Sequence, residues 1–349
     1  MTPFRLLLLP VCFFYGIITW FRNKFFDWGL LRSKKYPFPL ISVGNLSTGG
    51  TGKTPHVEYL VKHFKNQYKI AVLSRGYKRK TSGFIIVNKK HQAGDVGDEP
   101  LQISKKFPDV LVAVSESRRK GIKRIIKAQP ETNLVILDDA FQHRYVKPSM
   151  NIAITEYFKP FFDNYILPCG SLREYKSGIK RANAVIISKT PSVFSPLDRD
   201  YFLKKMAKFE LDNVFFSTIN YGNWVPLTSA CPEPKSKYKT LFLFSGIANI
   251  SAFEEYLKRH CHDLIIKQFP DHYQFTNSDL KELRKNFFDT FGDSKAIVIT
   301  EKDAMRLQSP TLKHELKNLP IYYIPIEVAF HRKDDKNFND FIINHLSQF

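Results

Sequence analysis

Apolar residues in this chain follow two spacings, short continuous runs and segments in which they recur every three or four positions. The continuous runs have the length of buried strands, and they cover residues 40–43, 70–73, 110–114, 134–137, 152–154 and 184–187. Directly after the first run, Val57, Leu60, Val61 and Phe64 show the helical spacing. Strands that alternate with helices in this way predict a parallel sheet covered on both faces.

A second series of the same kind follows residues 223–238, a stretch of Pro, Ser and Lys without a regular period that indicates a domain connection. Its predicted strands are 240–244, 264–267, 296–299 and 321–326, and its predicted helices are 250–260, 278–291 and 338–346. The pattern predicts an α/β protein with an N-terminal segment over 1–30, a first domain over 31–222, a linker over 223–238 and a second domain over 239–349.

The N-terminal segment contains an apolar run at 6–20 that is short for a membrane span and is interrupted by Pro10. Aromatic and basic residues follow at 21–28, a mixture that suits a membrane interface, and no signal-peptide cleavage site follows the run. The cations between Arg22 and Lys35 place the following chain on the cytoplasmic side if the positive-inside bias applies. The alternative to a membrane-associated helix is a core helix packed on the first domain.

The apolar run at 40–43 leads into Ser47-Thr-Gly-Gly-Thr-Gly-Lys-Thr54, which has the form of a phosphate-binding loop. Its glycines let successive backbone N–H groups face a phosphate, Lys53 supplies a cation, and the Thr54 hydroxyl can bind Mg²⁺. Ser47 stands where the usual pattern has Gly, and the alternative is a glycine turn that binds no nucleotide. The residues predicted to hold the nucleotide are Gly49, Gly50, Thr51, Gly52, Lys53 and Thr54.

The charge balance favours an anionic partner, because 53 Lys and Arg against 33 Asp and Glu give a net charge of +20. Nucleic acid is the weaker choice, since the cations are scattered and neither RNA-binding aromatic pairs nor zinc-ligand spacings accompany them. An anionic membrane surface or a phosphorylated substrate remains. The four cysteines are too sparse and too far apart for a disulfide framework or a metal cluster, which favours a reducing cytosol.

Two adjacent carboxylates end the apolar run at 134–137. Phosphoryl-transfer proteins place a carboxylate for Mg²⁺ at such a strand end, so Asp138 and Asp139 are candidate metal ligands. A helix cap or a solvated turn would give the same pattern. His143 follows closely, and its role stays open.

Two further segments contain candidate proton acceptors. Residues 93–100 are acidic and rich in glycine, as in a mobile catalytic loop where Asp98 or Glu99 accepts the proton of an attacking hydroxyl. The alternative for this segment is a turn followed by a helix start. His272 follows a predicted strand and could orient a carboxylate of the other domain, or it could be a packed loop histidine.

Taken in their order along the chain, these motifs resemble the tetraacyldisaccharide 4'-kinases, the lipid A biosynthesis kinase family, over most of the length. Their joint order is far more specific than any one of them. The runs that carry the resemblance are 44–45, 49–55, 74–77, 97–100, 138–143, 167–174, 244–249, 269–272 and 300–303.

The resemblance implies an enzyme that moves the γ-phosphate of ATP to the 4'-hydroxyl of a tetraacylated glucosamine disaccharide 1-phosphate, the lipid A precursor. It implies two α/β/α sandwich domains, the first a P-loop NTPase-like parallel sheet, with the active site in the cleft between them. The implied location is the cytoplasmic face of an anionic inner membrane, through a peripheral or single N-terminal helix. Neither nucleic acid nor an obligate protein partner is expected.

By matching position, the resemblance makes Asp98 the general base and His272 its partner across the cleft. The family usually has Gly where Ala140 stands and often a second His where Tyr273 stands, so the catalytic histidine here must be His272. The family does not keep the leading Gly of the loop, which explains Ser47.

The resemblance also assigns the metal and phosphate sites. Thr54, Asp138 and Asp139 would serve Mg²⁺, while Lys53 and the loop amides would hold phosphate. Arg173 and Glu174 would line the active site without separate roles.

Two rival functions fit parts of the sequence. A membrane-attached P-loop NTPase that switches protein assembly by hydrolysing GTP lacks the guanine motif, because Thr300-Glu-Lys-Asp303 has its Lys one place too late. A nucleic-acid-binding ATPase would use the basic surface alone.

Overall fold

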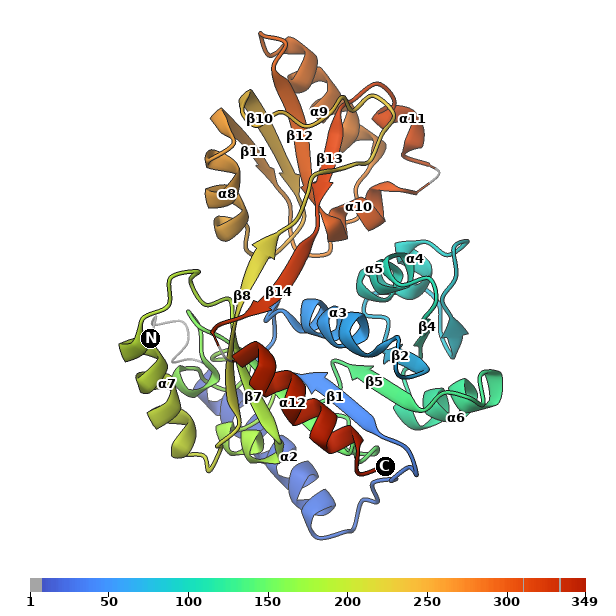
Figure 1. The fold of residues 1–349 in the computed structure, drawn as a ribbon, viewed down its shortest axis with the longest axis vertical. Coiled ribbons are helices and arrows are strands. Elements are labelled where there is room, and N and C mark those ends of the chain that lie inside the picture. The colour runs from blue at the N-terminus through green and yellow to red at the C-terminus, as the bar shows by residue number, and fades with distance from the viewer. Residues whose placement is uncertain (1–7, 310, 333) are drawn as a thin grey trace.

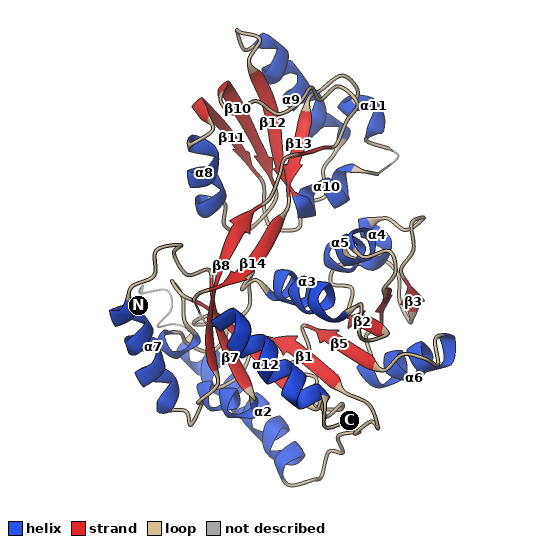
Figure 2. Ribbon diagram, viewed as in Figure 1, coloured by secondary structure: helices blue, strands red, loops and turns tan. Residues whose placement is uncertain are grey.

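The computed structural model describes residues 8–309, 311–332 and 334–349, so residues 1–7 of the predicted N-terminal segment lie outside the described residues. Strands and helices alternate along the chain and build two β-sheets, one in the lower and one in the upper part of Figure 1. Figure 2 shows helices beside the strands of both sheets. The predicted α/β class with parallel sheets is therefore confirmed.

Within the ranges just given, the larger sheet has nine strands. They are β1 (Leu40–Gly44), β2 (Ile70–Ser74), β3 (Ile85–Ile86), β4 (Leu111–Val114), β5 (Leu134–Asp138), β6 (Met150–Glu156), β7 (Ala184–Ser188), β8 (Val214–Tyr221) and β14 (Ile326–Phe330). Their order is β14-β8-β7-β6-β1-β5-β2-β4-β3, with only the edge strands β3 and β14 antiparallel to their neighbours. The strand β1 lies between β5 and β6, and ligands of such sheets bind beyond the carboxyl ends of strands at such crossover points.

The smaller sheet, as far as the described residues go, has five strands, and β9 is antiparallel to its neighbour. They are β9 (Val225–Pro226), β10 (Tyr238–Ser245), β11 (Cys261–Gln268), β12 (Lys295–Thr300) and β13 (Ile321–Ile324). Their order is β11-β10-β12-β13-β9, and the other neighbouring pairs are parallel.

The helices connect the strands and cover the sheets. They are α2 (Leu9–Asp27), α3 (Lys53–Phe64), α4 (Ala93–Val96), α5 (Asp98–Lys106), α6 (Arg118–Ala128), α7 (Pro196–Ala207), α8 (Ser251–Lys258), α9 (Asn277–Asp289), α10 (Glu301–Leu307), α11 (Lys313–Leu316) and α12 (Asp334–Leu346). Two short 3-10 helices are η1 (Phe161–Asp163) and η2 (Lys176–Arg181).

Alternating residues of β1 face two separate apolar cores. Ile41 belongs to the core that also contains Leu60 of α3, whereas Leu40 belongs to the core that contains Ile122 of α6. Every residue of β1 is buried. A strand covered on both faces carries a continuous apolar run, which is the pattern that the sequence showed at this position.

The C-terminal end of the chain returns to the larger sheet. The strand β14 pairs antiparallel with β8, and Phe338 of α12 packs its ring 5.1 Å from the ring of Phe215 in β8. The sequence prediction grouped 239–349 in one C-terminal domain, whereas β14 (Ile326–Phe330) belongs to the larger sheet through its pairing with β8. The reason is tertiary, because a short strand shows no partner in its own sequence.

Helix α2 packs one side on the first domain and leaves an apolar side exposed. Its residues Cys12, Gly16 and Phe26 are buried, whereas Phe14 and Ile18 are 65% and 67% exposed. The two alternatives for this segment, a lipid-contacting helix and a packed helix, are thus compatible. In the described ranges, no helix combines the length and the apolarity that crossing a membrane requires.

One expectation about the cysteines is wrong. Cys12 of α2 and Cys169 form a disulfide with their Cα atoms 6.1 Å apart, although 157 residues separate them in the sequence. The packing of α2 on the first domain brings the two residues together, and their spacing in the sequence does not predict that contact. Cys231 and Cys261 are free.

Candidate active site

The loop after β1 bends at two glycines before α3 begins. Gly49 has φ +105° and Gly52 has φ +89°, a left-handed conformation that residues with a side chain rarely adopt. The next residues, Lys53 and Thr54, form the first turn of α3. The structure therefore places the predicted nucleotide-binding residues in one turn at a helix N-terminus, where free N–H groups attract phosphate.

Side chains behind this loop hold its carbonyl groups. Ser188 Oγ donates to the carbonyl of Thr51 at 2.8 Å, and Nδ1 of His56 lies 2.7 Å from the carbonyl oxygen of Gly52. Burial lowers the pKa of His56 to about 4, so the ring is neutral and Nδ1 donates. The N–H groups of Gly50 and Gly52 have no acceptor among the described residues. The loop thus has its carbonyls fixed and these amides free for a ligand.

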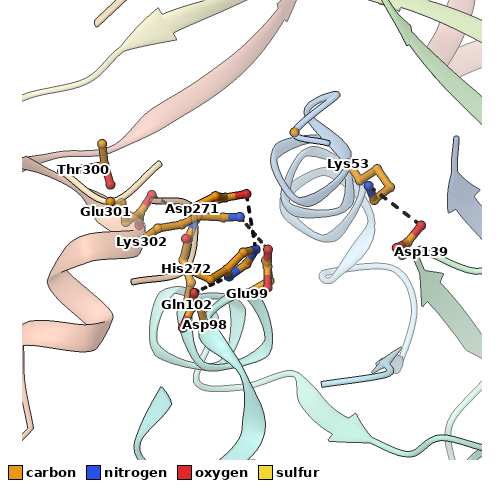
Figure 3. A network of polar contacts seen from close by, with 12 residues as sticks. Lys53, Asp98, Glu99, Gln102, Asp139, Asp271, His272, Thr300, Glu301 and Lys302 are labelled. Atoms are coloured by element: carbon orange, nitrogen blue, oxygen red, sulfur yellow. Dashed lines mark hydrogen bonds and ion pairs between the residues drawn. The ribbon is translucent and has the colours of Figure 1, made fainter. Parts of the chain in front are cut away.

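The two adjacent aspartates lie beside the start of this loop. Asp138 ends β5 and pairs in register with Val43 of β1. Asp139 accepts two hydrogen bonds from Arg173, at 2.8 and 3.1 Å, and its Oδ1 lies 3.8 Å from Lys53 Nζ (Figure 3). Burial alone would raise the pKa of Asp139, but Lys53 and Arg173 outweigh it and lower the pKa. Asp139 is therefore an ionised carboxylate that is already paired.

Asp138 has a different environment from Asp139. Its Oδ1 is buried without a hydrogen-bond partner in the part of the chain that the structure describes, and burial together with the charge of Asp139 raises the pKa of Asp138 to about 7. A buried carboxylate oxygen without a partner is costly, and Mg²⁺ sites often combine one or two carboxylates with phosphate oxygens and water. The described residues contain no group of three or more His, Cys, Asp or Glu side chains that could hold a metal alone. The residues fit a Mg²⁺ ion shared with a bound phosphate.

The predicted proton acceptor Asp98 is the first residue of α5, so the segment 93–100 forms helix starts rather than a mobile loop. Gly97 precedes it with φ +95°, and a Cβ at Gly97 would lie 3.3 Å from backbone atoms of Gly76. The motifs at 74–77 and 97–100 therefore pack backbone against backbone. This contact, together with the favourable position of an acid in the first turn of a helix, fixes Asp98.

The structure brings the two predicted catalytic residues into contact. His272 Nδ1 lies 2.9 Å from Asp98 Oδ2, although Asp98 begins α5 and His272 follows β11 of the smaller sheet, 174 positions later (Figure 3). The ring of His272 also packs edge-to-face on Tyr77 at 5.2 Å. Its neighbour Tyr273 instead stacks on Phe269 at 4.7 Å. The catalytic roles of Asp98 and His272 remain a prediction that this geometry permits.

Sequence reasoning missed Arg306, which also contacts Asp98. Its Nε and Nη2 lie 2.8 and 2.5 Å from Asp98 Oδ2. Burial alone would raise the pKa of Asp98, but hydrogen bonds from His272 and Arg306 outweigh it and lower the pKa to about 2. The motif 300–303 pointed to the same helix, α10, but not to this side chain. Asp98 is therefore ionised throughout the neutral pH range.

A second buried polar cluster joins α3, α5 and α10. Gln102 Nε2 donates to Glu58 at 2.7 Å and to Glu301 at 3.2 Å, and Lys106 Nζ lies 2.7 Å from Glu58 and 3.6 Å from Glu301. Burial raises the pKa of both glutamates, and the charge of Glu58 helps to raise the pKa of Glu301 to about 7. The cluster links the helix that follows the phosphate loop to the C-terminal domain.

Replacing Glu301 with Gln is expected to flatten the pH dependence of the free energy of unfolding. The folded-state pKa of Glu301, about 7, lies above its ordinary value of 4.5, so the folded protein binds more protons between these values. Its contribution to stability therefore falls as pH rises through this window. Between pH 5 and pH 8, the free energy of unfolding of the wild type should therefore fall by about 1 to 3 kcal/mol more than that of the variant.

Denaturant unfolding at pH 5 and pH 8 measures this difference. The matched control is Glu282→Gln, because the Glu282 side chain is 51% exposed and pairs with Lys267 at the surface. Equal pH dependence in Glu301→Gln and wild type would contradict the assigned protonation of Glu301.

Helix α2 contacts Arg173 and Glu174, the two residues that the resemblance placed in the lining of the active site. Tyr15 donates to the carbonyl of Arg173 at 2.9 Å, and Asn23 donates to the Glu174 carboxylate at 2.7 Å. Glu174 is buried, while the Arg173 guanidinium binds Asp139. The two residues predicted to line the site thus lie between α2 and the paired aspartates.

In the larger, mainly parallel sheet, strand β1 leads through a glycine loop into helix α3, and aspartates stand at the end of the adjacent strand β5. This arrangement defines a P-loop NTPase-like protein. Residues 4–347 match the family described as tetraacyldisaccharide-1-P 4'-kinase. The chain belongs to this family, as the sequence motifs predicted.

Known relatives agree over nearly the full length. The tetraacyldisaccharide 4'-kinase of Bacteroides thetaiotaomicron is 41% identical, with 98% of this chain and 93% of that protein covered. The protein of the same name from Flavobacterium psychrophilum is 39% identical, with 98% and 97% covered. The crystal structure of LpxK from Aquifex aeolicus in complex with ATP is 29% identical, with a TM-score of 0.73 over 98% of this chain and 99% of that one.

Proposed function

We propose that this protein transfers the γ-phosphate of ATP to the 4'-hydroxyl of a tetraacylated glucosamine disaccharide 1-phosphate in lipid A biosynthesis. Family membership supports this reaction class. The observation that carries the proposal is the contact of Asp98, at the start of α5, with His272 after β11, because it adds a proton acceptor for a hydroxyl to a phosphate-binding loop.

Phosphoryl transfer requires positioning and charge neutralisation more than covalent chemistry, and different residues of the site supply these two functions. The amides of Gly50 and Gly52 and the ammonium of Lys53 hold phosphate oxygens of ATP. Asp98 accepts the proton of the attacking hydroxyl, and His272 holds the Asp98 carboxylate in place.

Mg²⁺ would be held by the Thr54 hydroxyl and Asp138, with Asp139 beside them. When bound, the ion supplies positive charge to the phosphate oxygens. Asp138 is the better direct ligand, because its Oδ1 is without a partner while Asp139 is bound by Arg173. The charge of Glu99 also contributes to the raised pKa of Asp138, so the start of α5 lies within electrostatic reach of this site.

A mainly apolar cavity supports the proposal that part of the substrate is a lipid. Its volume is about 680 Å³. Most of its lining is apolar or aromatic, and polar residues form part of it; the lining residues are Ile17, Trp20, Asn164, Tyr165, Ile166, Leu172, Tyr175, Lys176 and Ser177. Leu172 of this lining is followed directly in the sequence by Arg173, whose guanidinium binds Asp139. Acyl chains fit an apolar cavity of this kind better than nucleic acid or a charged peptide does.

The exposed side of α2 supports attachment to the cytoplasmic face of the inner membrane without a span. Large apolar residues on this side are solvent-exposed, and basic residues follow them. Such a helix lies in the interface of an anionic bilayer, where the net charge of +20 adds attraction.

Replacing Phe13, Phe14 and Ile18 together with Ser is expected to weaken binding to vesicles of phosphatidylethanolamine and phosphatidylglycerol by at least about tenfold, since each buried apolar side chain contributes roughly 1.5 to 3 kcal/mol. The three residues are 61%, 65% and 67% exposed. Vesicle co-sedimentation measures the change, with Phe291→Ser as control because Phe291 is 89% exposed in the C-terminal domain. Unchanged sedimentation of the triple variant would contradict membrane contact by α2.

A substrate panel distinguishes the proposed kinase from its rivals. Purified protein with ATP and Mg²⁺ should form ADP when the lipid disaccharide 1-phosphate is added in detergent micelles. Nucleic acid or a protein extract should add nothing above the rate with buffer. ADP formation that only nucleic acid or protein stimulates would overturn the proposal.

A further inference from the structure

The carboxylate of Asp98 is bound on one oxygen only. Oδ2 is contacted by Nδ1 of His272 at 2.9 Å and by Nε and Nη2 of Arg306 at 2.8 and 2.5 Å. Oδ1 has no hydrogen-bond partner among the described residues. The two side chains on Oδ2 both come from the C-terminal domain, although Asp98 belongs to the first.

Arg306 is buried and makes hydrogen bonds besides those to Asp98. Its side chain is 1% exposed, and its Nη1 donates to the carbonyl of Gly246 at 2.8 Å and to Asp303 at 2.9 Å. Asp303 in turn accepts hydrogen bonds from Ser245 Oγ and from the N–H of Gly246. A buried arginine with this many partners has one available orientation.

The backbone carbonyl of Gly246 connects both partners of Asp98. It accepts the N–H of His272 at 3.2 Å and the Nη1 of Arg306 at 2.8 Å. His272 and Arg306 are therefore positioned relative to each other by one turn after β10, before either reaches Asp98. This geometry belongs to a site that was built to hold a carboxylate in a defined rotamer.

We propose that Arg306 is a positioning residue for phosphoryl transfer, which with His272 fixes Oδ2 of Asp98 and leaves Oδ1 to receive the proton of the attacking hydroxyl. The inference rests on the proposed kinase function. In the step, the O–H bond of the substrate breaks and its proton goes to Oδ1. The freed oxygen forms a bond to the γ-phosphorus, and the bond from the γ-phosphorus to the bridging oxygen breaks, so that ADP leaves.

The charge of Arg306 has a second consequence, on the protonation of Asp98. The charged and titratable groups that face Asp98 are Glu99 on its own helix, Lys302, Asp303 and Arg306 on α10, and Asp271 and His272 after β11. Removing the guanidinium leaves burial, which raises the pKa of Asp98, opposed mainly by His272. The pKa should rise by about 1 to 3 units, since an adjacent opposite charge has an effect of that size.

Arg306→Gln tests the proposal in a lipid phosphorylation assay. The turnover number kcat should fall by about 10²-fold, because a misplaced reacting group costs about that much, while KM for ATP stays within about threefold. The acid limb of the kcat profile should move to higher pH by about 1 to 3 units. Arg306→Lys keeps the charge but not the two-point contact. It should restore part of the lost kcat and return the acid limb most of the way to its wild-type pH.

The matched control is Arg259→Gln, an arginine of the same domain that is 72% exposed and pairs with Glu255 on the surface. It should keep the wild-type kcat and pH profile. Thermal unfolding checks that each variant is folded, and if Arg306→Gln is not, the kcat and pH profile of Arg306→Lys decide.

The outcomes separate the two levels of the proposal. A wild-type protein that phosphorylates no lipid would remove the proposed function itself. An active wild type with wild-type kcat and an unshifted acid limb in folded Arg306→Gln would overturn the role of Arg306 alone. A loss confined to KM for ATP would overturn it too, because positioning of Asp98 acts on the transferred proton.

Discussion

Asp98→Asn is expected to lower kcat for lipid phosphorylation by about 10²- to 10⁴-fold, with the affinity for ATP little changed. Asparagine keeps the shape of the side chain and one oxygen, but it cannot take up the proton of the attacking hydroxyl. The phosphate-binding loop is built from other residues, so ATP should still bind. Single-turnover kinetics and calorimetric titration with a non-hydrolysable ATP analogue measure the two quantities.

Asp109→Asn is the matched control for this variant, since Asp109 follows the same helix and its side chain is exposed. Turnover close to wild type in Asp98→Asn would remove the proton-acceptor role. A parallel loss of ATP affinity would instead indicate that Asp98 supports the nucleotide site.

Asp138→Asn should lower kcat by about 10²- to 10³-fold and raise the Mg²⁺ concentration needed for half-maximal rate. The carboxylate of Asp138 has a buried oxygen without a partner, which is the position that a metal ion or its water would satisfy. Asp139→Asn removes the negative charge and one of the two acceptor oxygens that bind Arg173, but its effect on the Mg²⁺ requirement should be smaller. The rate as a function of Mg²⁺ at saturating ATP measures both variants.

The control for the metal assignment is internal. If Asp139→Asn raises the Mg²⁺ requirement more than Asp138→Asn does, the direct ligand is Asp139 and the unpartnered oxygen of Asp138 needs another explanation. Equal Mg²⁺ requirements in wild type and both variants would contradict a metal site at this strand end.

Local chemistry made the phosphate loop and most strands predictable from the sequence. The loop needs glycine where φ is positive and a lysine and threonine at the start of the next helix, and these requirements lie within one short segment. Strands buried on both faces need continuous apolar runs, so β1 and β5 could be placed to within a residue.

Contacts between distant segments could not be predicted in the same way. Arg306, like most arginines in a sequence, carries no sign that its partner lies 208 residues away, and Gln102 looks like any polar helix residue. The disulfide of Cys12 with Cys169 and the return of β14 to the first sheet have the same origin. Each depends on tertiary docking, which local spacing does not encode.

The segment 93–100 shows how one pattern can support two structures. Glycine and acidic residues are typical of mobile loops, but acids also favour the first turn of a helix, and the second effect applies here. The family motif at 97–100 pointed to Asp98 whether the segment is a loop or a helix, because a motif match depends on the order of residues and not on their secondary structure.

The most direct test of the central claim is the identity of the phosphorylated product. Protein, Mg²⁺, γ-³²P-labelled ATP and the tetraacylated disaccharide 1-phosphate are incubated in detergent, and the lipid is isolated and analysed by mass spectrometry and ³¹P NMR. The expected product carries one additional, labelled phosphate monoester at the 4' position. Labelled inorganic phosphate with no labelled lipid, or label at any other position, would contradict it.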